Sequence, residues 1–554
     1  MSRDLVRAYL GGELRALQPD DEPGAPPLSA AALARAVARA RRPLAPEVHR
    51  ALVAQNARLA ASPARDAHLE ALGRGAAAVV TGQQVGLFLG PLYTLHKAAS
   101  AVVLARALTA QTGTPVVPVF WLQTEDHDLA EIASVAVPSG PRVATLAVPV
   151  DAANRIAIAH CRLPAEIDGC LDALSEAIAE GQGGRPPGPH AAEHLARLRR
   201  HYRPGAPWAE AFAGVLAELF APEGLVLVDP REPALAQAVA PVHARALADA
   251  APIAAALIAS DAELARAGFA ISVHVRPGAP LSFFHPEGPH GPRVRLEPAA
   301  GGPGDGDRFV ECGRTATHGR AELAAALAAD PLRFSTSALL RPIAQDTLLP
   351  TAAYVGGPGE VAYFAQLPPL YRAFDRPLPA IVPRARFRIV DERARRLLDR
   401  LGLSAGDAAQ PEAELLARLR AADPPGEPGA PATGGEVTAR LLAPFARAHG
   451  ELAAQLAGGP ELARALARTR GSVERAIGKL AGKVERAALY RDAARVDAVR
   501  RLRALLAPDG TPQERTHGLA GFASRGGDRA IVERVIAAID PADPAGWFTL
   551  RELA

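Results

Sequence analysis

The chain has 554 residues and a formal charge of +3 at pH 7, from 62 lysines and arginines against 59 aspartates and glutamates. This near balance gives nucleic acid and anionic membranes no electrostatic field to follow, so we expect neither as a partner. Hydrophobic residues make up 49% of the chain and charged residues 22%. These proportions exclude intrinsic disorder, a collagen helix and a disulfide scaffold, and the length predicts roughly three to four globular domains.

Neither the N-terminus nor the cysteine content predicts export. The first residues, MSRDLVRAYLGGELRAL, carry Asp4 and contain no apolar run of the kind found in signal peptides. No stretch approaches the roughly 18 uninterrupted apolar residues of a membrane-spanning helix. The scattered cysteines Cys161, Cys170 and Cys312 are too few for a disulfide framework or a four-cysteine zinc site. We therefore expect a cytoplasmic protein with unreactive thiols.

Two successive strand–turn–helix patterns follow a region of helical spacing at residues 28–75. The first has an apolar strand at Ala77–Thr81, a turn with three glycines and a helix through about Leu108. The second has a β-branched and aromatic strand at Val116–Leu122 and a polar turn leading to Ile132. Strands that are apolar throughout are typical of a parallel sheet covered on both faces. The pattern predicts an α/β fold built on a doubly wound parallel sheet.

This strand–turn–helix pattern is interrupted twice before it resumes. Residues 136–210 lose it and contain the Gly/Pro stretch GQGGRPPGPH, which indicates an insertion. GLVLVDP, from Gly224 to Pro230, predicts another buried parallel strand. In residues 250–330 a helix precedes four strand-like segments, FAISVHVRPG, LSFFHPEG, RVRLEP and RFVEC. The strand–turn–helix pattern resumes in PTAAYVGGPGEVAYFAQLPPLYRAF, and PAIVPR predicts a further strand.

From about Arg386 the composition changes to alanine, leucine, arginine and glutamate, which predicts helices divided by a polar linker at Asp423–Gly435. The second helical stretch carries an apolar stripe typical of a coiled coil or a helical hairpin, formed by Leu462, Leu466, Val473, Ile477, Leu480 and Val484. We expect a core from residues 1–135, 211–249 and 331–390, insertions at 136–210 and 250–330, a helical coiled-coil domain at 391–510, and a C-terminal segment at 511–554 packed on the core.

The first candidate site motif is TGQQVGLFLGPLYTLHK, between the first predicted strand and its helix. Gly82, Gly86 and Gly90 allow the backbone to approach a ligand closely, and the N–H groups at a helix start suit an anion. Side-chain donors stand around that point: Gln83, Gln84, Tyr93 and Lys97. The alternative is a tight strand-to-helix turn with Lys97 on a solvated surface. Neither GxGxxG nor GxxxxGK[ST] occurs here, so neither standard phosphate loop is available.

The second motif is TEDHD, Thr124–Asp128, at the carboxyl end of the second predicted strand, where ligands bind in open α/β sheets. Three acids and a histidine in four residues are costly to gather without a cation, a proton or a polyhydroxylated ligand. They could hold magnesium or a substrate amine, with His127 as acid or base. The alternative is an aspartate that caps a helix, with the other acids complementing the helix dipole.

The third motif is YVGGPGEVAYF, in which Gly356, Gly357 and Gly359 follow a predicted strand and Glu360 opens a helix. The alternative for Glu360 is that it serves only the helix dipole. Across the three motifs we take Asp126, His127 and Lys97 as candidate catalytic residues and assign no metal ligand. The candidate binding residues are Thr81, Gly82, Gln83, Gln84, Gly86, Gly90, Tyr93, Glu125, Asp128, Arg341, Gln345, Gly356, Gly357 and Glu360.

Taken together and in order, several segments resemble those of the bacillithiol biosynthesis cysteine-adding enzymes, the BshC family. They are TGQQVGLFLGPLYTLHKA, PVFWLQTEDHDLAEI, LLRPIAQDTLLPTAAYVGGPGEVAYFAQL, VPR and PDGTPQER. The similarity extends over nearly the whole chain, whereas the insertions and the helical region match only in character.

The resemblance implies a Rossmann-like core with two connecting-peptide-type insertions and a helical coiled-coil domain that mediates homodimerisation. It implies a ligase that joins the carboxyl group of cysteine to the amino group of glucosaminyl-malate, with ATP activating the carboxylate. The core resembles class I synthetases, yet neither HIGH nor KMSKS occurs. GPLYTLHK occupies the place of the first only through Gly90, His96 and Lys97.

Two other classes of function stay open at this point. One is a related ATP-dependent ligase or nucleotidyltransferase that acts on another amine. The other is a non-catalytic coiled-coil protein whose core senses a ligand. The product formed from ATP, cysteine and an amine would distinguish all three.

Overall fold

The computed structural model describes residues 3–14, 17, 26–299, 308–422, 434–456, 459–523 and 526–553. Two compact units divide the chain. The first comprises residues 1–139, 144–389 and 514–554, and the second comprises residues 140–143 and 390–513. Residues 423–433 of the predicted linker lie outside the described residues.

A five-stranded parallel sheet forms the centre of the first unit, in the spatial order β12-β11-β1-β2-β5. Its strands are β1 (Ala77–Gln83), β2 (Val116–Leu122), β5 (Val226–Val228), β11 (Thr351–Gly356) and β12 (Ala380–Pro383). Taken in chain order, this is the Rossmann-like arrangement in which the first strand lies in the middle and the direction of winding reverses beside it. The predicted doubly wound sheet is confirmed, and β2 has the predicted bounds.

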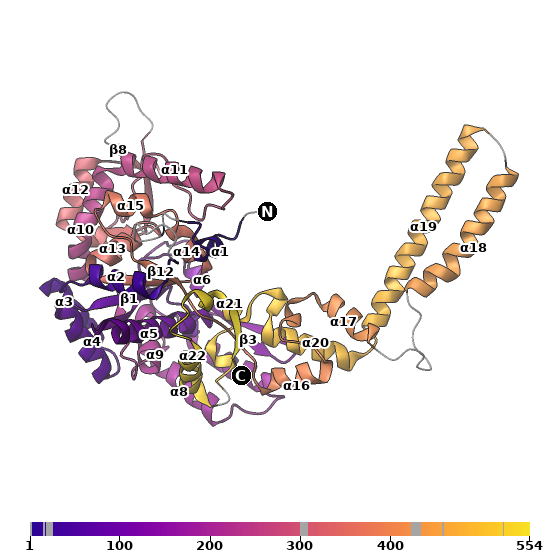
Figure 1. Cartoon of the computed structure of the whole chain (residues 1–554), viewed down its shortest axis with the longest axis horizontal. Coiled ribbons are helices and arrows are strands. Elements are labelled where there is room, and N and C mark those ends of the chain that lie inside the picture. The colour runs from indigo at the N-terminus through magenta and orange to yellow at the C-terminus, as the bar shows by residue number, and fades with distance from the viewer. Residues whose placement is uncertain are drawn as a thin grey trace. The chain divides into compact units, whose positions relative to one another are not determined.

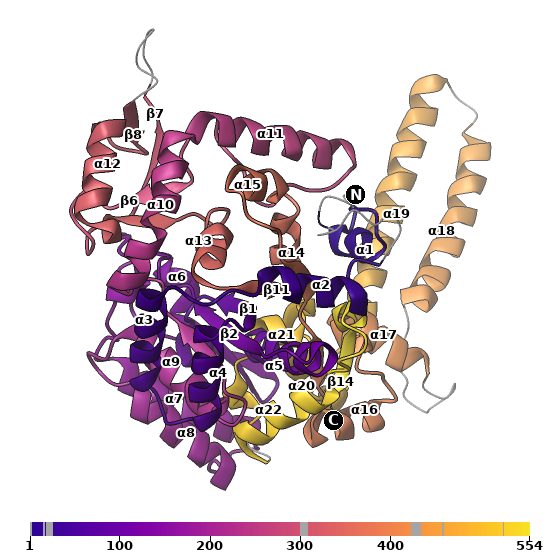
Figure 2. The same cartoon turned by 60° about the vertical axis from the view of Figure 1, so that its left-hand side comes forward.

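Helices cover both faces of this sheet, as strands that are apolar on both sides require. Along β1, Ala77 and Val79 belong to one hydrophobic core, and Ala78 and Val80 belong to the other. Figure 2 shows α5 running beside β1 and β2. Helices of the first core include α2 (Ala30–Ala40), α5 (Tyr93–Thr112), α9 (Trp208–Leu219) and α22 (Gly527–Ala538). Helices of the second include α3 (Pro46–Ala57), α4 (Pro63–Gly73), α10 (Pro233–Ala248) and α13 (Arg341–Leu348).

Residues 282–336 contain an antiparallel sheet in the order β10-β6-β7-β8-β9, and β10 lies beyond the end predicted for the second insertion. Its strands are β6 (Ser282–Phe284), β7 (Val294–Pro298), β8 (Arg308–Glu311), β9 (Thr317–Gly319) and β10 (Phe334–Thr336). Three of the four predicted strand-like segments contribute to it. The prediction for FAISVHVRPG is wrong, because Phe269–Gly278 forms no strand. There the side chain of Gln366 takes the place of a neighbouring strand, since its amide bonds both the N–H and the C=O of Val273.

The second unit consists of helices. A small core joins α16 (Glu392–Leu401), α17 (Glu412–Ala421) and α20 (Ala493–Leu506). The long helices α18 (Gly434–Gln455) and α19 (Pro460–Leu489) lie side by side and antiparallel, a helical hairpin (Figure 1). The predicted apolar stripe lies on α19, where Leu462 is 39% exposed and Leu480 is 46% exposed. The hairpin therefore leaves part of its apolar surface uncovered.

The chain returns to the first unit at its C-terminal end. The last strand, β14 (Leu550–Leu553), pairs in parallel with β13 (Arg386–Ile389), and α22 packs against α5. Among the described residues no single helix is long and apolar enough to cross a membrane. The helices α10 and α11 (Ala250–Arg266) reach that threshold only as a pair, and they are bent by 79°.

Candidate active site

A cavity of about 330 Å³ lies at the carboxyl ends of β1 and β11, and we name it the central cavity. Ligands of open α/β sheets bind at this point, where the strand order reverses. All three sequence motifs contribute to its walls. The lining residues are Gly82, Gln83, Gln84, Tyr93, Lys97, Trp121, Gln123, Asp126, Ala338, Arg341, Tyr354, Gly357, Pro358, Gly359, Glu360, Tyr363, Arg384 and Arg515.

Lys97 is buried on the wall of this cavity and forms an ion pair with Glu360, whose side chain is 22% exposed. Its Nζ also donates to the carbonyl oxygen of Gly82 at 2.8 Å and to Oε1 of Gln83 at 2.7 Å. Burial lowers the pKa of Lys97, and the Glu360 carboxylate opposes that shift. Lys97 is one of only three lysines in the chain, and a lysine amine, unlike a guanidinium, can lose its proton. In a sequence that otherwise uses arginine, this lysine is a signal of function.

Glu360 has two tasks at once. It begins α14 (Pro358–Phe364), where its Oε2 accepts from the N–H of Gly357 at 2.8 Å, and its Oε1 accepts from the hydroxyl of Tyr354. Burial acts to raise the pKa of Glu360, but Lys97 and these hydrogen bonds outweigh it and lower the pKa. The helix-start alternative is therefore realised together with the ion pair, and Glu360 carries a negative charge that fixes Lys97.

Arg341 contributes a second buried cation. Its guanidinium donates to Oε1 of Gln345 at 2.8 Å and to the hydroxyl of Tyr363 at 2.6 Å, and it lies 5.0 Å from the centre of the Tyr354 ring. Gln345 is fully buried and does not line the cavity. The candidate binding residue Gln345 thus orients Arg341 from behind.

Two further arginines of the cavity, Arg384 and Arg515, are absent from the candidates named on the sequence. Each ends a segment that carries the family resemblance, VPR and PDGTPQER, and that position is the signal that could have identified them. Glu514 is buried and accepts two hydrogen bonds from Arg384, at 2.9 and 3.0 Å, and one from Arg386 at 2.8 Å. The C-terminal segment therefore supplies Glu514, which holds Arg384 in place, and the next residue, Arg515. Both lie on α21 (Gln513–Thr516).

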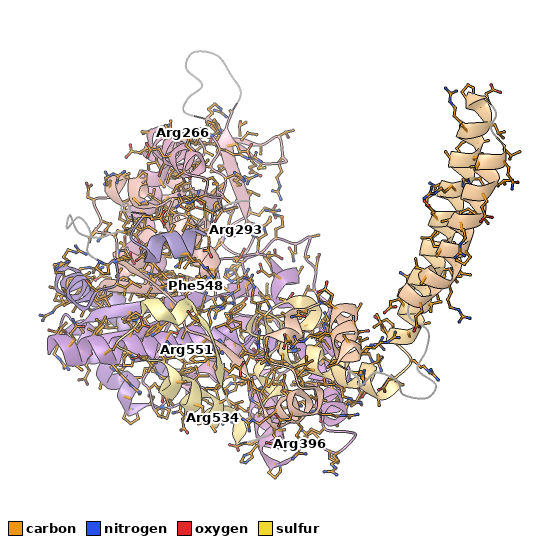
Figure 3. The ribbon with its side chains drawn as sticks, turned by 45° about the vertical axis from the view of Figure 1, so that its right-hand side comes forward. Arg266, Arg293, Arg396, Arg534, Phe548 and Arg551 are labelled. Carbon is orange, nitrogen blue, oxygen red and sulfur yellow. The ribbon has the colours of Figure 1, made fainter. Side chains whose placement is uncertain are left out.

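Asp126 is the member of TEDHD that lines the central cavity. Its Oδ2 accepts from Nε2 of Gln84 at 2.9 Å, and its Oδ1 accepts from the N–H of His127 at 2.7 Å and from Nη1 of Arg293 at 3.2 Å. Arg293, labelled in Figure 3, directly precedes β7. Burial opposes ionisation of Asp126, but Arg293, Gln84 and the His127 N–H outweigh it and lower its pKa.

His127 does not line the central cavity. Its Nδ1 accepts a hydrogen bond from Nη1 of Arg293 at 3.1 Å, which leaves the proton of the neutral ring on Nε2. Burial, Arg293 and Arg155 together lower the pKa of His127 to about 4. At neutral pH this histidine is therefore uncharged, with one ring nitrogen already occupied.

Glu125 and Asp128 have structural partners. Glu125 is buried and accepts from the N–H of Thr336 at 3.2 Å and from its hydroxyl, and burial raises the pKa of Glu125. Asp128 caps α6 (Leu129–Ile132), where its Oδ1 accepts from the N–H of Glu131 at 3.1 Å. The capping alternative thus holds for Asp128, while Glu125 forms hydrogen bonds with β10.

The glycine turn after β1 borders a second cavity, of about 390 Å³, which we name the adjoining cavity. Gly86 and Gly90 line it, Gly90 has a φ of 62°, and a Cβ at Gly86 would lie 3.0 Å from the Gly90 Cα. Between them Phe88 and Leu89 are buried with φ of 50° and 72°. Such left-handed conformations cost about 1–3 kcal/mol each in non-glycine residues and persist only where packing imposes them.

Two remaining candidates lie outside the central cavity. Thr81 is fully buried and donates to the carbonyl oxygen of Val355 at 2.7 Å, and Gly356 ends β11 without lining the cavity. Among the described residues no group of three or more histidines, cysteines or carboxylates stands in a geometry that could hold a metal ion.

Comparison with known proteins gives one family. The model described as "Bacillithiol biosynthesis BshC, N-terminal Rossmann-like domain" matches residues 30–385. The chain is 36% identical over 479 residues to "Putative cysteine ligase BshC" of Koribacter versatilis, covering 86% of this chain and 85% of that protein. It is 34% identical to the protein of the same name from Solibacter usitatus, over 82% of this chain and 80% of the relative. For the one from Symbiobacterium thermophilum the identity is 33%, over 83% and 82%.

Proposed function

The chain belongs to the BshC family of bacillithiol biosynthesis, and from this premise we propose that it is a ligase that forms an amide between the cysteine carboxylate and the amine of glucosaminyl-malate. The relatives are named as cysteine ligases, which supports cysteine as one substrate. The observation that carries the proposal is the central cavity. Lys97, Arg341 and Arg384 converge there on one side of the sheet's switch point, as binding and activation of an anionic substrate require.

Amide formation from a carboxylate needs a driving force, for which we propose ATP. A cysteine carboxylate oxygen displaces pyrophosphate from the α-phosphorus, and the acceptor amine then attacks the cysteinyl adenylate, releasing AMP and a proton. The cavity suits these anions because the buried cations Lys97, Arg341 and Arg384 line it.

Lys97 is the residue we assign to the charge that develops on the departing pyrophosphate. Glu360, the Gly82 carbonyl and Oε1 of Gln83 occupy its three N–H donors, so the ammonium is fixed in position and acts on that charge through its electric field. Arg341, braced by Gln345 and Tyr363, is the residue we assign to the cysteine carboxylate. Lys97 lies on α5, which follows β1, and Arg341 lies on α13, which precedes β11, so a ligand that bridges them lies across the switch point between these two strands.

We propose that magnesium binds at this site only together with ATP, through the phosphates. Asp126 and Glu360 are the carboxylates that line the cavity, and Glu360 is already paired with Lys97. Mg²⁺ commonly takes one or two protein carboxylates and completes its shell with phosphates and water. We therefore propose Asp126 as the protein ligand of a phosphate-bound magnesium ion, held in place by Arg293 and Gln84.

We also propose that the protein acts in the cytoplasm as a homodimer through the α18–α19 hairpin. The exposed apolar side chains of the hairpin support this, because an uncovered stripe on a long helix is typical of a surface that packs on a partner helix. They are Leu441 and Leu452 on α18 and Leu462 and Leu480 on α19.

Mass spectrometry tests the function directly. The purified protein is incubated with ATP, magnesium, cysteine and glucosaminyl-malate, and the expected products are the cysteinyl amide, AMP and pyrophosphate. Lys97→Met should reduce turnover at least 100-fold, whereas Lys483→Met, an exposed lysine of α19, serves as the matched control. Cysteine-dependent pyrophosphate exchange without the amide would indicate another amine acceptor. Ligand binding without any ATP consumption would favour a sensor over an enzyme.

A further inference from the structure

The adjoining cavity shares a wall with the central cavity. Gln83, Gln84, Tyr93 and Arg515 line both. A reaction that joins two substrates is accelerated when both are held with their reacting atoms in contact. Two cavities that meet at the carboxyl end of β1 provide such an arrangement, with one compartment for the activated carboxylate and one for the nucleophile.

The two cavities differ in charge. Three further cations, Lys97, Arg341 and Arg384, line the central cavity, and none of them lines the adjoining one. Of the described residues that line the adjoining cavity, Arg515 and Glu131 are the charged ones, and the other polar groups are amides, hydroxyls and backbone. That lining does not suit a triphosphate. It suits a ligand that has many hydroxyl groups together with one cationic and at least one anionic group.

Arg515 is the cation at the shared wall. Its guanidinium makes neither a hydrogen bond nor an ion pair with the described part of the chain, in contrast to Arg384, which Glu514 holds on two sides. An arginine presents several N–H donors in a planar fork that matches a carboxylate. The unpaired Arg515 therefore has its full donor set available to a ligand.

Thr94 is a buried polar residue at the wall of the adjoining cavity. It lines the adjoining cavity in the first turn of α5, it is only 2% exposed, and its hydroxyl has no hydrogen-bond partner among the described groups. A buried hydroxyl without a partner is costly, and in native proteins such groups are nearly always satisfied. The hydroxyl itself has almost no surface open to the cavity, so a ligand would reach it only if the start of α5 shifted.

Glu131 offers the opposite charge. Its Oε2 accepts from Nε2 of Gln84 at 2.9 Å, the same amide that bonds Asp126 of the central cavity. The carboxylate is exposed, so its second oxygen is open to an ammonium group. Gln84 thus connects the negative groups of the two cavities across their shared wall.

We propose that the adjoining cavity binds the amine acceptor, a hydroxylated amine that carries a carboxylate, with Arg515 on the carboxylate and Glu131 on the ammonium. This rests on the proposed function and deepens it, because glucosaminyl-malate belongs to that class. Arg515 and Glu131 then determine which amine is accepted, and the central cavity determines which carboxylate is activated.

Steady-state kinetics with two acceptors tests this assignment. Arg515→Met should raise the KM for glucosaminyl-malate tenfold or more, but the KM for cysteine and for ATP no more than about threefold. For methyl glucosaminide, which has the amine and hydroxyls but no carboxylate, the ratio of wild-type to Arg515→Met KM should be close to one. Glu131→Gln should weaken both acceptors alike. The matched controls are Arg372→Met and Glu263→Gln, exposed residues outside both cavities.

Calorimetric titration of glucosaminyl-malate without ATP distinguishes the possible failures. Wild-type protein that does not bind this compound overturns both the acceptor site and the proposed function. Wild-type protein that binds it and forms the amide, together with an Arg515→Met variant of equal affinity, overturns the acceptor site alone. An equal rise of KM for all three substrates in Arg515→Met also overturns it, since Arg515 would then serve the cavity as a whole.

Discussion

Replacing Glu514 by glutamine tests how the C-terminal segment holds the cationic wall of the central cavity. Glu514 is fully buried between Arg384 and Arg386, and His96 lies 3.4 Å from its Oε2. Burial alone would raise the pKa of Glu514, but His96 and Arg384 outweigh it and hold the pKa well below its usual range. The carboxylate is therefore charged in the folded protein, and glutamine removes that charge with little change of shape.

The expected loss of stability is large. Removing one partner of a buried ion pair costs about 3–5 kcal/mol, because the other charge is left in the interior. Glutamine keeps one acceptor oxygen for the two guanidiniums, so we expect about 3 kcal/mol for Glu514→Gln and about 5 kcal/mol for Glu514→Ala. Because the pKa of the folded state is depressed, the wild-type advantage is fully present above the ordinary glutamate pKa and is lost as the pH falls toward the folded-state value.

Urea unfolding followed by tryptophan fluorescence measures this. The three tryptophans, Trp121, Trp208 and Trp547, are all buried and all belong to the first unit, so their signal is independent of the helical unit. Glu533→Gln is the control, because its partner Arg529 keeps its two bonds to Glu223 and the Glu533 side chain is 60% exposed, which limits the loss to about 0.5 kcal/mol. If Glu514→Gln unfolds within about 1 kcal/mol of that control, the reasoning on the buried cluster is wrong.

His127→Gln should leave the pH profile of kcat between pH 6 and 8 unchanged, because a histidine with a pKa of about 4 does not titrate there; a limb that disappears in the variant would contradict this. Replacing Val473, Ile477 and Leu480 by aspartate should give monomers in light scattering, because charges on the apolar stripe prevent helix packing. The unfolding transition followed by tryptophan fluorescence should not change. A wild-type protein that is already a monomer would refute the dimer. At pH 8, DTNB should react rapidly with Cys312 alone, because burial raises the pKa of the other two thiols to about 11, and three fast thiols would contradict that.

The parallel sheet could be predicted because its strands are apolar throughout, and Val116–Leu122 agrees to the residue. The error at Phe269–Gly278 has a physical cause. Ile271, Val273 and Val275 alternate with exposed residues as in a strand, but no strand of the described part of the chain pairs with them, and Gln366 bonds the backbone of Val273 instead. Period-two alternation reports which side chains are half-buried, and it carries no information about what pairs with the backbone.

The site shows a similar limit. A motif at a strand end identifies which segment meets the cavity, and the pattern does not separate a side chain that lines it from one that supports it. Asp126 lines the cavity while the adjacent Glu125 is bonded to Thr336. The local sequence does not predict the positions of Arg384 and Arg515, because nothing in VPR or PDGTPQER shows that the chain brings them to the same wall. Such long-range pairing follows from topology alone.

The ion cluster around Glu514 also has a consequence for synthesis of the protein. Arg384 and Glu514 are 130 residues apart in the chain. At a translation rate of about 5–20 residues per second, roughly 6 to 26 s pass between the two on the ribosome. During that interval Arg384 and Arg386 lack their counter-charge, so the nascent core cannot close around them. A chain that stops before residue 514 has two arginines in its interior without a counter-charge. Such a chain should stay incompletely folded and be a target for proteolysis.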